Sequence, residues 1–368
     1  MVTLIVEPNP NGHRMASVRD VARVAHREGS EVVLLSCDGV RDREEFAVNM
    51  AGIPARVLER FDDPVPSTRD LVDAVAGAAR EVGADRIVLM EADNALFSWW
   101  YRAFRPLRQL PVRPQVSAFL TRWPRASWSL RKENRYFVKI RAAKTLLVLA
   151  AKLTGTVTNA SGFAGRDVRG TGWPVRNVPD PADCLAHSRD RKALREQYGL
   201  PAERHLAGIF GGVDIRKDVP LALAAVLGAG DGWDLLLAGR VSEEVRAWLD
   251  GLSVEEQNRM VVRDGFLSDE ELDSLLAASD AVILLMWLEG PSGIMGKALA
   301  ADVPVLTARS RSRAKELAAL HRGVATADTA EALAAGLRRI AELPQGAPRA
   351  DVVPPTRESF AETILGLK

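Results

Sequence analysis

Short apolar and β-branched runs alternate with segments of helical periodicity along almost the whole chain. Strands are expected at Val2–Glu7 and Glu31–Ser36, and between them Val18, Val21 and Ala25 recur at helical spacing. Parallel strands need a long crossover, which is usually a helix, so the alternation favours a parallel, twisted sheet with helices on both faces. The sequence therefore predicts an α/β fold with doubly wound, Rossmann-like sheets.

The alternation comes in two series of strands and helices. The first continues with strands at Arg86–Met90, Gln115–Leu120 and Gly155–Thr158 and helices at Thr68–Val82 and Arg131–Lys152. The second has strands at His205–Phe210, Trp233–Ala238, Met260–Arg263, Ala281–Met286 and Val303–Thr307 and helices starting near Pro220, Ser242, Ser268, Gly293 and Ser312. Helices at Thr329–Leu343 and Arg357–Leu367 follow. The spacing of Ser268 and Glu271 is that of a capping box.

Turn-forming residues interrupt the alternation between the two series. The stretches Gly170–Pro174 and Pro179–Pro181 are rich in glycine and proline and lack apolar periodicity. We predict one domain over residues 1–172, joined by the terminal helix 356–368, and a second over residues 173–355, with a cleft between them. A chain of 368 residues is long enough for two such domains.

Composition argues against several functional classes. The formal net charge of +1 gives no indication of a nucleic-acid partner. Cys37 and Cys184 are far apart, and the five histidines lack metal-ligand spacing, so neither a zinc site nor a disulfide framework is predicted. The N-terminal residues do not have the pattern of a secretory signal, and the apolar run Thr145–Ala151 is too short to span a bilayer. We expect a cytoplasmic protein that uses no metal and no cofactor.

Two loops of the second series could hold a phosphorylated ligand. Gly211 and Gly212 follow a strand, and glycines let the backbone approach a ligand closely. Arg216 and Lys217, at the following turn, could pair with phosphates, although a solvated turn with two basic residues is the alternative.

The second of these loops contains Glu289 and leads into a helix. Glu289 could accept hydrogen bonds from sugar hydroxyls, while the backbone N–H groups of Ser292, Gly293 and Ile294 at the helix start could hold an anion. The alternative is a glycine-containing turn with a surface glutamate.

Polar residues also follow two strands of the first series. Gly12, His13 and Arg14 come after the first strand, where His13 could polarise a substrate oxygen or simply be solvated. Glu91 and Asp93 follow a later strand, and their carboxylates could bind an acceptor or cap the next helix. The carboxyl ends of parallel strands meet at one sheet edge, where such folds bind ligands.

The segment Arg122–Lys152 is strongly basic. It contains nine Arg and Lys residues and one acid, Glu133, with aromatic residues interleaved. A basic, aromatic helix can lie on an anionic membrane or grip a phosphorylated acceptor. The alternative is a solvated basic helix over a core.

Five elements between Gly211 and Val305 occur in a fixed order. They are Gly211 with Lys217, the aliphatic strand Leu235–Gly239, the run Val261–Leu272 of the form V-x-x-x-G-x-L-x-x-E-E-L, Ser279–Val282, and Glu289–Val305 with its E-G, A-x-A and P-V pairs. This order resembles the donor-binding domain of retaining glycosyltransferases of the GT-B fold, the family-4 group. The linker Val175–Pro181 and the terminal helix look like the segments that connect the two domains of that fold.

The resemblance implies roles for particular residues. Lys217, Glu289 and His13 would be catalytic, with Lys217 neutralising the donor diphosphate and Glu289 holding hydroxyls of the transferred sugar. On the acceptor side it implies Gly12, Arg14, Glu91 and Asp93. The donor-binding residues that it implies are Gly211, Gly212, Arg216, Gly239, Phe266, Gly290, Ser292, Gly293, Ile294 and Lys297.

Three residues depart from the family's pattern. Gly212 stands where the family has an arginine, Asp218 stands where it has a glycine, and Lys297 replaces the second glutamate of its E-x(7)-E pair. An ammonium cannot accept hydrogen bonds from a ribose as a carboxylate does. Lys297 could instead supply the positive charge that is missing at Gly212.

The function predicted from this resemblance is that of a hexosyltransferase-like, retaining glycosyltransferase. It would move a sugar from a UDP- or GDP-linked donor to a small-molecule, glycan or lipid-linked acceptor, without a metal and with possible peripheral membrane contact through Arg122–Lys152. Two alternatives stay open: a GT-B protein without transferase activity that serves as a binding subunit, and an interaction protein of the membrane surface. A sugar-nucleotide epimerase fits the motif order less well.

Overall fold

The chain forms two compact units. The computed structural model describes residues 1–368 except 12–13, 125–131, 166–171, 182, 187–189, 288–291, 321, 344–355 and 368, and the side chains of 132–135. The N-terminal unit comprises Met1–Ala164, Val168–Pro179 and Arg357–Lys368, and the C-terminal unit comprises Gly165–Asp167 and Asp180–Thr356.

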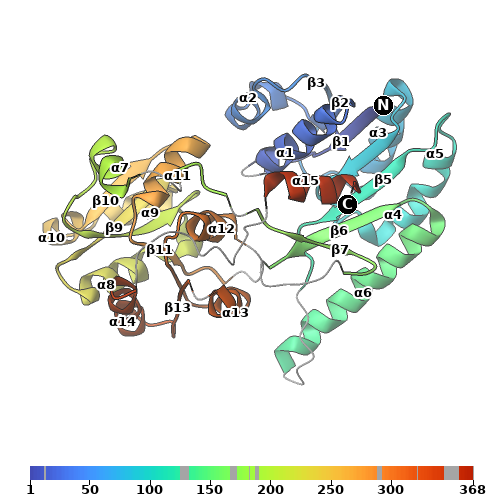
Figure 1. Cartoon of the computed structure of the whole chain (residues 1–368). Coiled ribbons are helices and arrows are strands. Elements are labelled where there is room, and N and C mark those ends of the chain that lie inside the picture. Colours follow the sequence, from blue (N-terminus) through green and yellow to red (C-terminus); the bar gives the residue numbers. More distant parts are fainter. Residues whose placement is uncertain are drawn as a thin grey trace. The chain divides into compact units, whose positions relative to one another are not determined.

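The N-terminal unit is built on a parallel sheet of seven strands in the order β3-β2-β1-β4-β5-β6-β7 (Figure 1). Its strands are β1 (Val2–Val6), β2 (Glu31–Cys37), β3 (Ala55–Phe61), β4 (Arg86–Leu89), β5 (Gln115–Leu120), β6 (Asn159–Ala164) and β7 (Arg176–Pro179). Its helices are α1 (Arg14–Arg27), η1 (Val40–Asp42), α2 (Glu44–Met50), α3 (Thr68–Val82), α4 (Leu96–Arg102), α5 (Phe104–Arg108), α6 (Lys132–Thr154) and α15 (Arg357–Leu365).

The last helix of the chain completes the core of the N-terminal unit. Phe360 of α15 lies with its ring centroid 5.5 Å from that of Phe119 on β5 and 5.8 Å from that of Phe163 on β6. Asn159 at the start of β6 donates to the carbonyls of Thr363 and Ile364 at 3.1 and 3.2 Å. Aromatic packing and capping of the helix end together hold α15 against the sheet.

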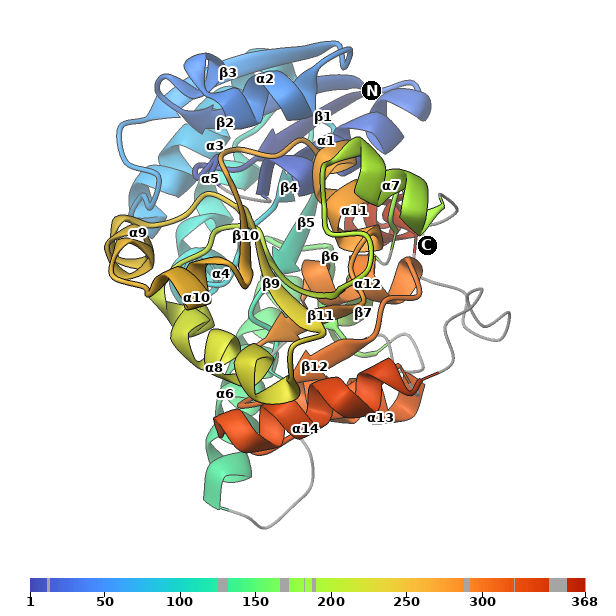
Figure 2. The ribbon, with the colours of Figure 1, turned by 90° about the vertical axis from the view of Figure 1, so that its left-hand side faces the viewer.

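The C-terminal unit has a parallel sheet of six strands in the order β10-β9-β8-β11-β12-β13 (Figure 2). Its strands are β8 (His205–Phe210), β9 (Trp233–Gly239), β10 (Met260–Asp264), β11 (Ala281–Leu284), β12 (Val305–Thr307) and β13 (Gly323–Ala325). Its helices are α7 (Arg191–Gln197), η2 (Ile215–Lys217), α8 (Val219–Ala229), α9 (Glu243–Asp250), α10 (Val254–Gln257), α11 (Asp269–Ala277), α12 (Gly293–Ala300), α13 (Arg311–Leu320) and α14 (Ala330–Ala341).

Both faces of the C-terminal sheet are buried, as its apolar sequence requires. Along β8, Ala207 and Ile209 pack into a cluster with α8 and α14, whereas Leu206 and Phe210 pack into a second cluster with α7, α11 and α12. Successive side chains of a strand point to opposite faces, so one continuous apolar strand contributes to two cores. The predicted α/β fold with doubly wound sheets is confirmed.

The predicted elements agree best where capping and periodicity are both strong. The helix Thr68–Val82 and the strands Gln115–Leu120 and His205–Phe210 have the predicted bounds. The capping box of Ser268 and Glu271 is present at the start of α11, with Ser268 accepting from the Glu271 amide at 3.2 Å.

The strand predicted at Gly155–Thr158 is wrong. Gly155 has a positive φ of 71° and follows the end of α6, so the residues after it form a turn and β6 starts at Asn159. Part of the stretch predicted as a linker is also a strand, because β7 pairs with β6 through Arg176 to Pro179. The first sheet therefore extends beyond the boundary placed after residue 172.

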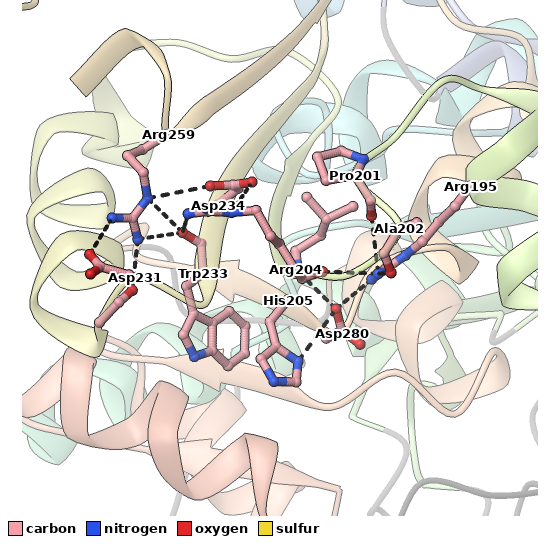
Figure 3. A network of polar contacts seen from close by, with 12 residues as sticks. Arg195, Pro201, Ala202, Arg204, His205, Asp231, Trp233, Asp234, Arg259 and Asp280 are labelled. Carbon is pink, nitrogen blue, oxygen red and sulfur yellow. Dashed lines mark hydrogen bonds and ion pairs between the residues drawn. The ribbon is translucent and has the colours of Figure 1, made fainter. Parts of the chain in front are cut away.

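A buried carboxylate joins several segments of the C-terminal unit (Figure 3). Asp280, immediately before β11, accepts from the amide of Leu206 at 2.7 Å and pairs with Arg195 at 2.5 Å and Arg191 at 2.9 Å. Arg195, on α7, also donates to the carbonyls of Ala278, Pro201, Ala202 and Arg204. One ion pair thereby fixes α7, the end of α11 and the first residues of β8 to one another.

Breaking this ion pair should destabilise the protein strongly. We expect Asp280→Leu or Arg195→Met alone to lower the free energy of unfolding by about 3–5 kcal/mol, because each leaves a buried charge without its main partner. The double variant Arg195→Met/Asp280→Leu should lose less than the sum of the single changes. Urea unfolding of the four proteins tests this, and additive losses would contradict the coupling.

Candidate functional site

The strand order reverses beside the first strand in both sheets. The carboxyl ends of β1 and β4 adjoin in the N-terminal unit, and those of β8 and β11 adjoin in the C-terminal unit. Open α/β sheets bind ligands at such a switch point, because the loops after the two strands lead to opposite faces. Most of the site residues predicted from the sequence follow one of these strands or the strand beside it.

A close approach of two glycines shapes the loop after β8. Gly239, at the end of β9, has a φ of 135°, and a Cβ at this position would lie 2.0 Å from the carbonyl oxygen of Gly211. No other residue fits at position 239, so the two backbones can meet only because Gly239 lacks a side chain. The Gly211 amide donates to the Ala238 carbonyl at 2.9 Å, which holds the end of β8 against β9.

Lys217 turns back toward the end of β8. Its Nζ donates to the carbonyl oxygen of Phe210, the last residue of the strand. Burial lowers the pKa of the Lys217 ammonium to about 8. Among the described residues its bond is to a neutral carbonyl and not to a carboxylate, so a positive charge is held at the carboxyl edge of the sheet.

The other charges of this loop are balanced within the loop or by a distant arginine. Arg216 is mostly exposed and pairs with Asp214 at 2.6 Å. Asp218 pairs with Arg309 at 2.5 Å, and Arg309 also pairs with Asp328 at 2.6 Å. The negative charge that Asp218 adds to the loop is thus opposed by Arg309, which the sequence analysis missed, because no local pattern links residues 91 positions apart.

Lys297 pairs with Asp273, a fully buried carboxylate on α11. The second oxygen of Asp273 accepts from the Leu185 amide at 2.8 Å. Burial raises the pKa of the Asp273 carboxyl, although the Lys297 ammonium opposes this shift. The charge of Lys297 is therefore balanced inside the domain, and this contact does not support the hypothesis that Lys297 compensates for the arginine missing at Gly212.

A glutamate at position 297 would face a buried carboxylate. We expect Lys297→Glu to lower the free energy of unfolding by about 3–5 kcal/mol, because two buried carboxylates would meet and Asp273 would lose its cation. The matched control is Asp273→Asn/Lys297→Gln, in which two neutral amides can still hydrogen-bond. Thermal unfolding of both variants is the measurement, and a Lys297→Glu protein as stable as the control would contradict the assignment.

The start of α12 carries part of the predicted anion site. The hydroxyl of Ser292 accepts from the Met295 amide at 3.3 Å, so Ser292 caps the helix, and Gly293 and Ile294 form its first turn. Glu289 and Gly290 lie outside the described residues. Phe266, after β10, is half-buried and has the guanidinium of Arg240 5.3 Å from its ring centroid.

In the N-terminal unit, Arg14 lies between two carboxylates. Its guanidinium pairs with Glu91, which follows β4, and lies 3.7 Å from Glu7, which follows β1. Glu91 is also 3.6 Å from Arg122. Gly12 and His13 lie outside the described residues. The structure therefore brings Arg14 and Glu91 together and adds Glu7 to them.

Glu7 is the residue of this site that the sequence analysis did not select. Its side chain is buried, and burial raises the pKa of its carboxyl to about 7 against the opposing effects of the Asn9 amide and of Arg14. A pocket beside it is lined by Glu7, Arg14, Ser17, Met90, Glu91, Phe119, Thr121 and Phe163. The sequence did contain one indication that Glu7 belongs to the site, because Glu7 is the last residue of the predicted first strand.

Asp93 does not cap a helix, contrary to one of the two roles considered for it. The N-cap position of α4 is Ala95, which makes no side-chain capping bond. Asp93 is buried, accepts from the Thr121 hydroxyl and the Arg122 amide at 3.1 Å each, and pairs with Lys144 of α6. Its carboxylate joins the end of β5 to α6.

The basic segment is only partly available to solvent. Lys144 is buried against Asp93, and Arg141 donates to the Pro124 carbonyl at 3.0 Å and lies over the ring of Trp123. Within the described residues no helix combines the length and apolar character needed to cross a membrane. The same residues contain no group of three or more side chains suited to hold a metal ion.

Comparison with known proteins identifies the fold. Residues 190–361 match the family described as glycosyl transferases group 1. The solved structure of Anabaena HepE in complex with UDP is similar over all of this chain and 95% of that one, with 17% identity and a TM-score of 0.62. The chain has the GT-B fold. The resemblance to GT-B glycosyltransferases inferred from the sequence is thereby confirmed.

Further solved structures share this GT-B architecture. Sucrose-phosphate synthase from Thermosynechococcus elongatus is 18% identical, with a TM-score of 0.63 and coverage of 100% of this chain and 94% of that one. A glycosyltransferase from Rickettsia africae is 12% identical, with a TM-score of 0.64 and coverage of 99% and 93%. No curated protein sequence matches the chain.

Proposed function

We propose that the protein is a glycosyltransferase that takes a sugar from a nucleotide-activated donor bound by the C-terminal unit. The observation that carries the proposal is the coincidence of the group 1 family match, residues 190–361, with a sheet that has Lys217 at its switch point. The UDP seen with Anabaena HepE supports a UDP-linked donor, and GDP is the second candidate base.

Lys217 is suited to the leaving diphosphate. Its ammonium is partly buried and, among the described residues, bonded only to a carbonyl, so an arriving anion meets a charge that no carboxylate pairs with directly. A diphosphate would in turn favour the charged form of the lysine. This positive charge stabilises the leaving group without a metal or a cofactor.

Transfer then needs leaving-group stabilisation and positioning more than a strong protein nucleophile. This is the requirement of front-face substitution, so we propose transfer of a hexosyl group with retention at the donor carbon. A GT-B protein without transferase activity that serves as a binding subunit is the alternative, and nucleotide binding together with product analysis separates it from the enzyme.

Donor binding should depend on the charge of Lys217. We expect 1 mM UDP or GDP to raise the melting temperature by mass action, and Lys217→Met to weaken nucleotide affinity at least tenfold, whereas Lys192→Met on α7 should have no effect. Because the pKa of Lys217 lies near 8, nucleotide affinity should fall as the pH rises through about 8. Calorimetry between pH 6.5 and 9 measures this.

No melting shift with any nucleotide would favour the binding-subunit alternative. Nucleotide binding with neither donor hydrolysis nor sugar transfer would favour it as well.

A peripheral contact with an anionic membrane is a second proposal, carried by α6. Its side chains Tyr136, Leu146 and Leu153 are 64%, 67% and 88% exposed, and with exposed Lys139 they fall on one face of the helix at spacings near whole turns. An exposed apolar stripe with a basic residue fits the interface of an anionic bilayer. Such a contact would suit a lipid-linked acceptor and a cytoplasmic location beside a membrane.

Liposome sedimentation tests this proposal. We expect the protein to bind vesicles with 30% phosphatidylglycerol several-fold better than neutral vesicles, and Leu146→Glu/Leu153→Glu to abolish the difference. Val254→Glu, which alters an exposed apolar residue of α10, is the matched control. Equal binding by both variants would contradict a contact through α6.

A further inference from the structure

The pocket beside Glu7 is built at the switch point of the N-terminal sheet. Glu7 follows β1 and Glu91 follows β4, the two strands at which the order reverses. The apolar wall includes Phe119 and Phe163, whose rings meet edge to face with centroids 4.8 Å apart, and Thr121 lines the pocket beside them. The pocket has a volume of about 20 Å³, room for one hydroxyl or water-sized group, so it admits only one edge of a ligand.

The backbone of Glu7 is fixed from its neighbouring strand. The Glu7 amide donates to the Leu35 carbonyl at 3.1 Å, and the Ser36 hydroxyl donates to the Glu7 carbonyl at 2.7 Å. Its carboxylate accepts from the Asn9 amide at 3.0 Å, and the whole residue is 2% exposed. A carboxylate held in this way can serve as a rigid hydrogen-bond acceptor.

The charges around the pocket select the kind of ligand. Glu7 and Glu91 are opposed by Arg14, and Glu91 also by Arg122, so the site is nearly balanced. A cationic ligand would compete with Arg14 for both carboxylates, and an anionic ligand would be repelled by them. A neutral hydroxylated edge can donate to carboxylates, accept from a guanidinium and lay its C–H face on an aromatic ring.

We propose that this pocket receives a neutral, hydroxyl-bearing edge of the acceptor, such as a sugar ring, and that Glu7 in its ionised state accepts a hydrogen bond from one of its hydroxyls. The inference rests on the proposed function and names the acceptor class of that function. Glu7 here is a specificity residue that recognises the acceptor, and the proposal assigns it no proton transfer.

Recognition by ionised Glu7 makes acceptor binding depend on pH. The charged groups that face Glu7 are Arg14 of α1 and Glu91 after β4, and the carboxyl of Glu7 has a pKa of about 7. The ionised fraction then increases roughly tenfold between pH 6 and pH 8. Because only the competent fraction binds, the affinity for the neutral glycoside should rise by nearly the same factor.

The experiment uses the full chain and three probes of matched size: methyl α-D-glucopyranoside, glucosamine and gluconate. Titrations followed by NMR should show that the neutral glycoside binds best and that its affinity rises about tenfold from pH 6 to pH 8. Glu7→Gln should remove this rise, whereas Glu31→Gln, an exposed glutamate at the start of β2, should keep it. No binding of the glycoside, a preference for a charged probe, or an unchanged pH dependence in Glu7→Gln would overturn the proposal.

Two further measurements distinguish a failure of this proposal from a misfolded variant and from a failure of the proposed function. The raised pKa of Glu7 means that the neutral carboxyl stabilises the fold below about pH 4.5, and this stability is lost as the pH rises through about 7. Glu7→Gln should therefore fold and gain stability relative to the wild type between pH 5 and pH 8. The melting shift with UDP reports the C-terminal unit alone, so its loss would contradict the proposed function even where the glycoside still binds.

Discussion

The reversal of strand order beside β1 and β8 is the constraint on which both candidate sites depend. Crossovers between parallel strands are right-handed, so connections that run outward in both directions from the first strand must place their helices on opposite faces. The loops after β1 and β4, and those after β8 and β11, consequently diverge. The loops at the carboxyl ends of these strands therefore need no special sequence to leave space for a ligand, because the strand order itself makes them diverge.

The charged side chains of these loops are paired differently in the two units. In the C-terminal unit the two charged residues that depart from the family's pattern have partners of opposite sign: Asp218 pairs with Arg309, and Lys297 pairs with Asp273. In the N-terminal unit two carboxylates share one guanidinium, and the more buried of them, Glu7, has a raised pKa. The first arrangement fixes the structure around Lys217, whereas the second leaves a carboxyl that titrates near neutral pH.

Local signals in the sequence were sufficient for the fold and for part of the sites. Ser67 accepts from the Asp70 amide at the start of α3, and Gly83 ends that helix at a positive φ, so short-range capping determined its bounds. The apolar strands and the turns at Gly211 and Gly239 could also be predicted from the local sequence. These features depend on neighbours within a few residues.

The contacts that could not be predicted join residues far apart in the sequence. Asp93 pairs with Lys144, which is 51 positions away in the sequence, and Asp218 pairs with Arg309, which is 91 positions away. β3 and β7 were missed because they lie toward the edges of the sheet, where strands carry charged residues and do not form continuous apolar runs. Glu7 was passed over because a carboxylate ending a strand looks like a solvated residue, whereas its burial depends on loops that follow other strands.

The state of Lys217 links these observations to the chemistry. A lysine at the carboxyl edge of the sheet could be neutralised by a carboxylate, as Lys297 is, or stay charged against a carbonyl. A lysine paired with a carboxylate would have to break that ion pair before it could bind a phosphate, and breaking a buried pair is costly. A lysine bonded to a carbonyl gives up only one hydrogen bond to a neutral group. Asp214 and Asp218 are engaged by Arg216 and Arg309, so these arginines keep the two nearest carboxylates of the loop from occupying Lys217. Because all the remaining charges of the loop are paired with one another or with Arg309, the ammonium of Lys217 stays available for an incoming anion.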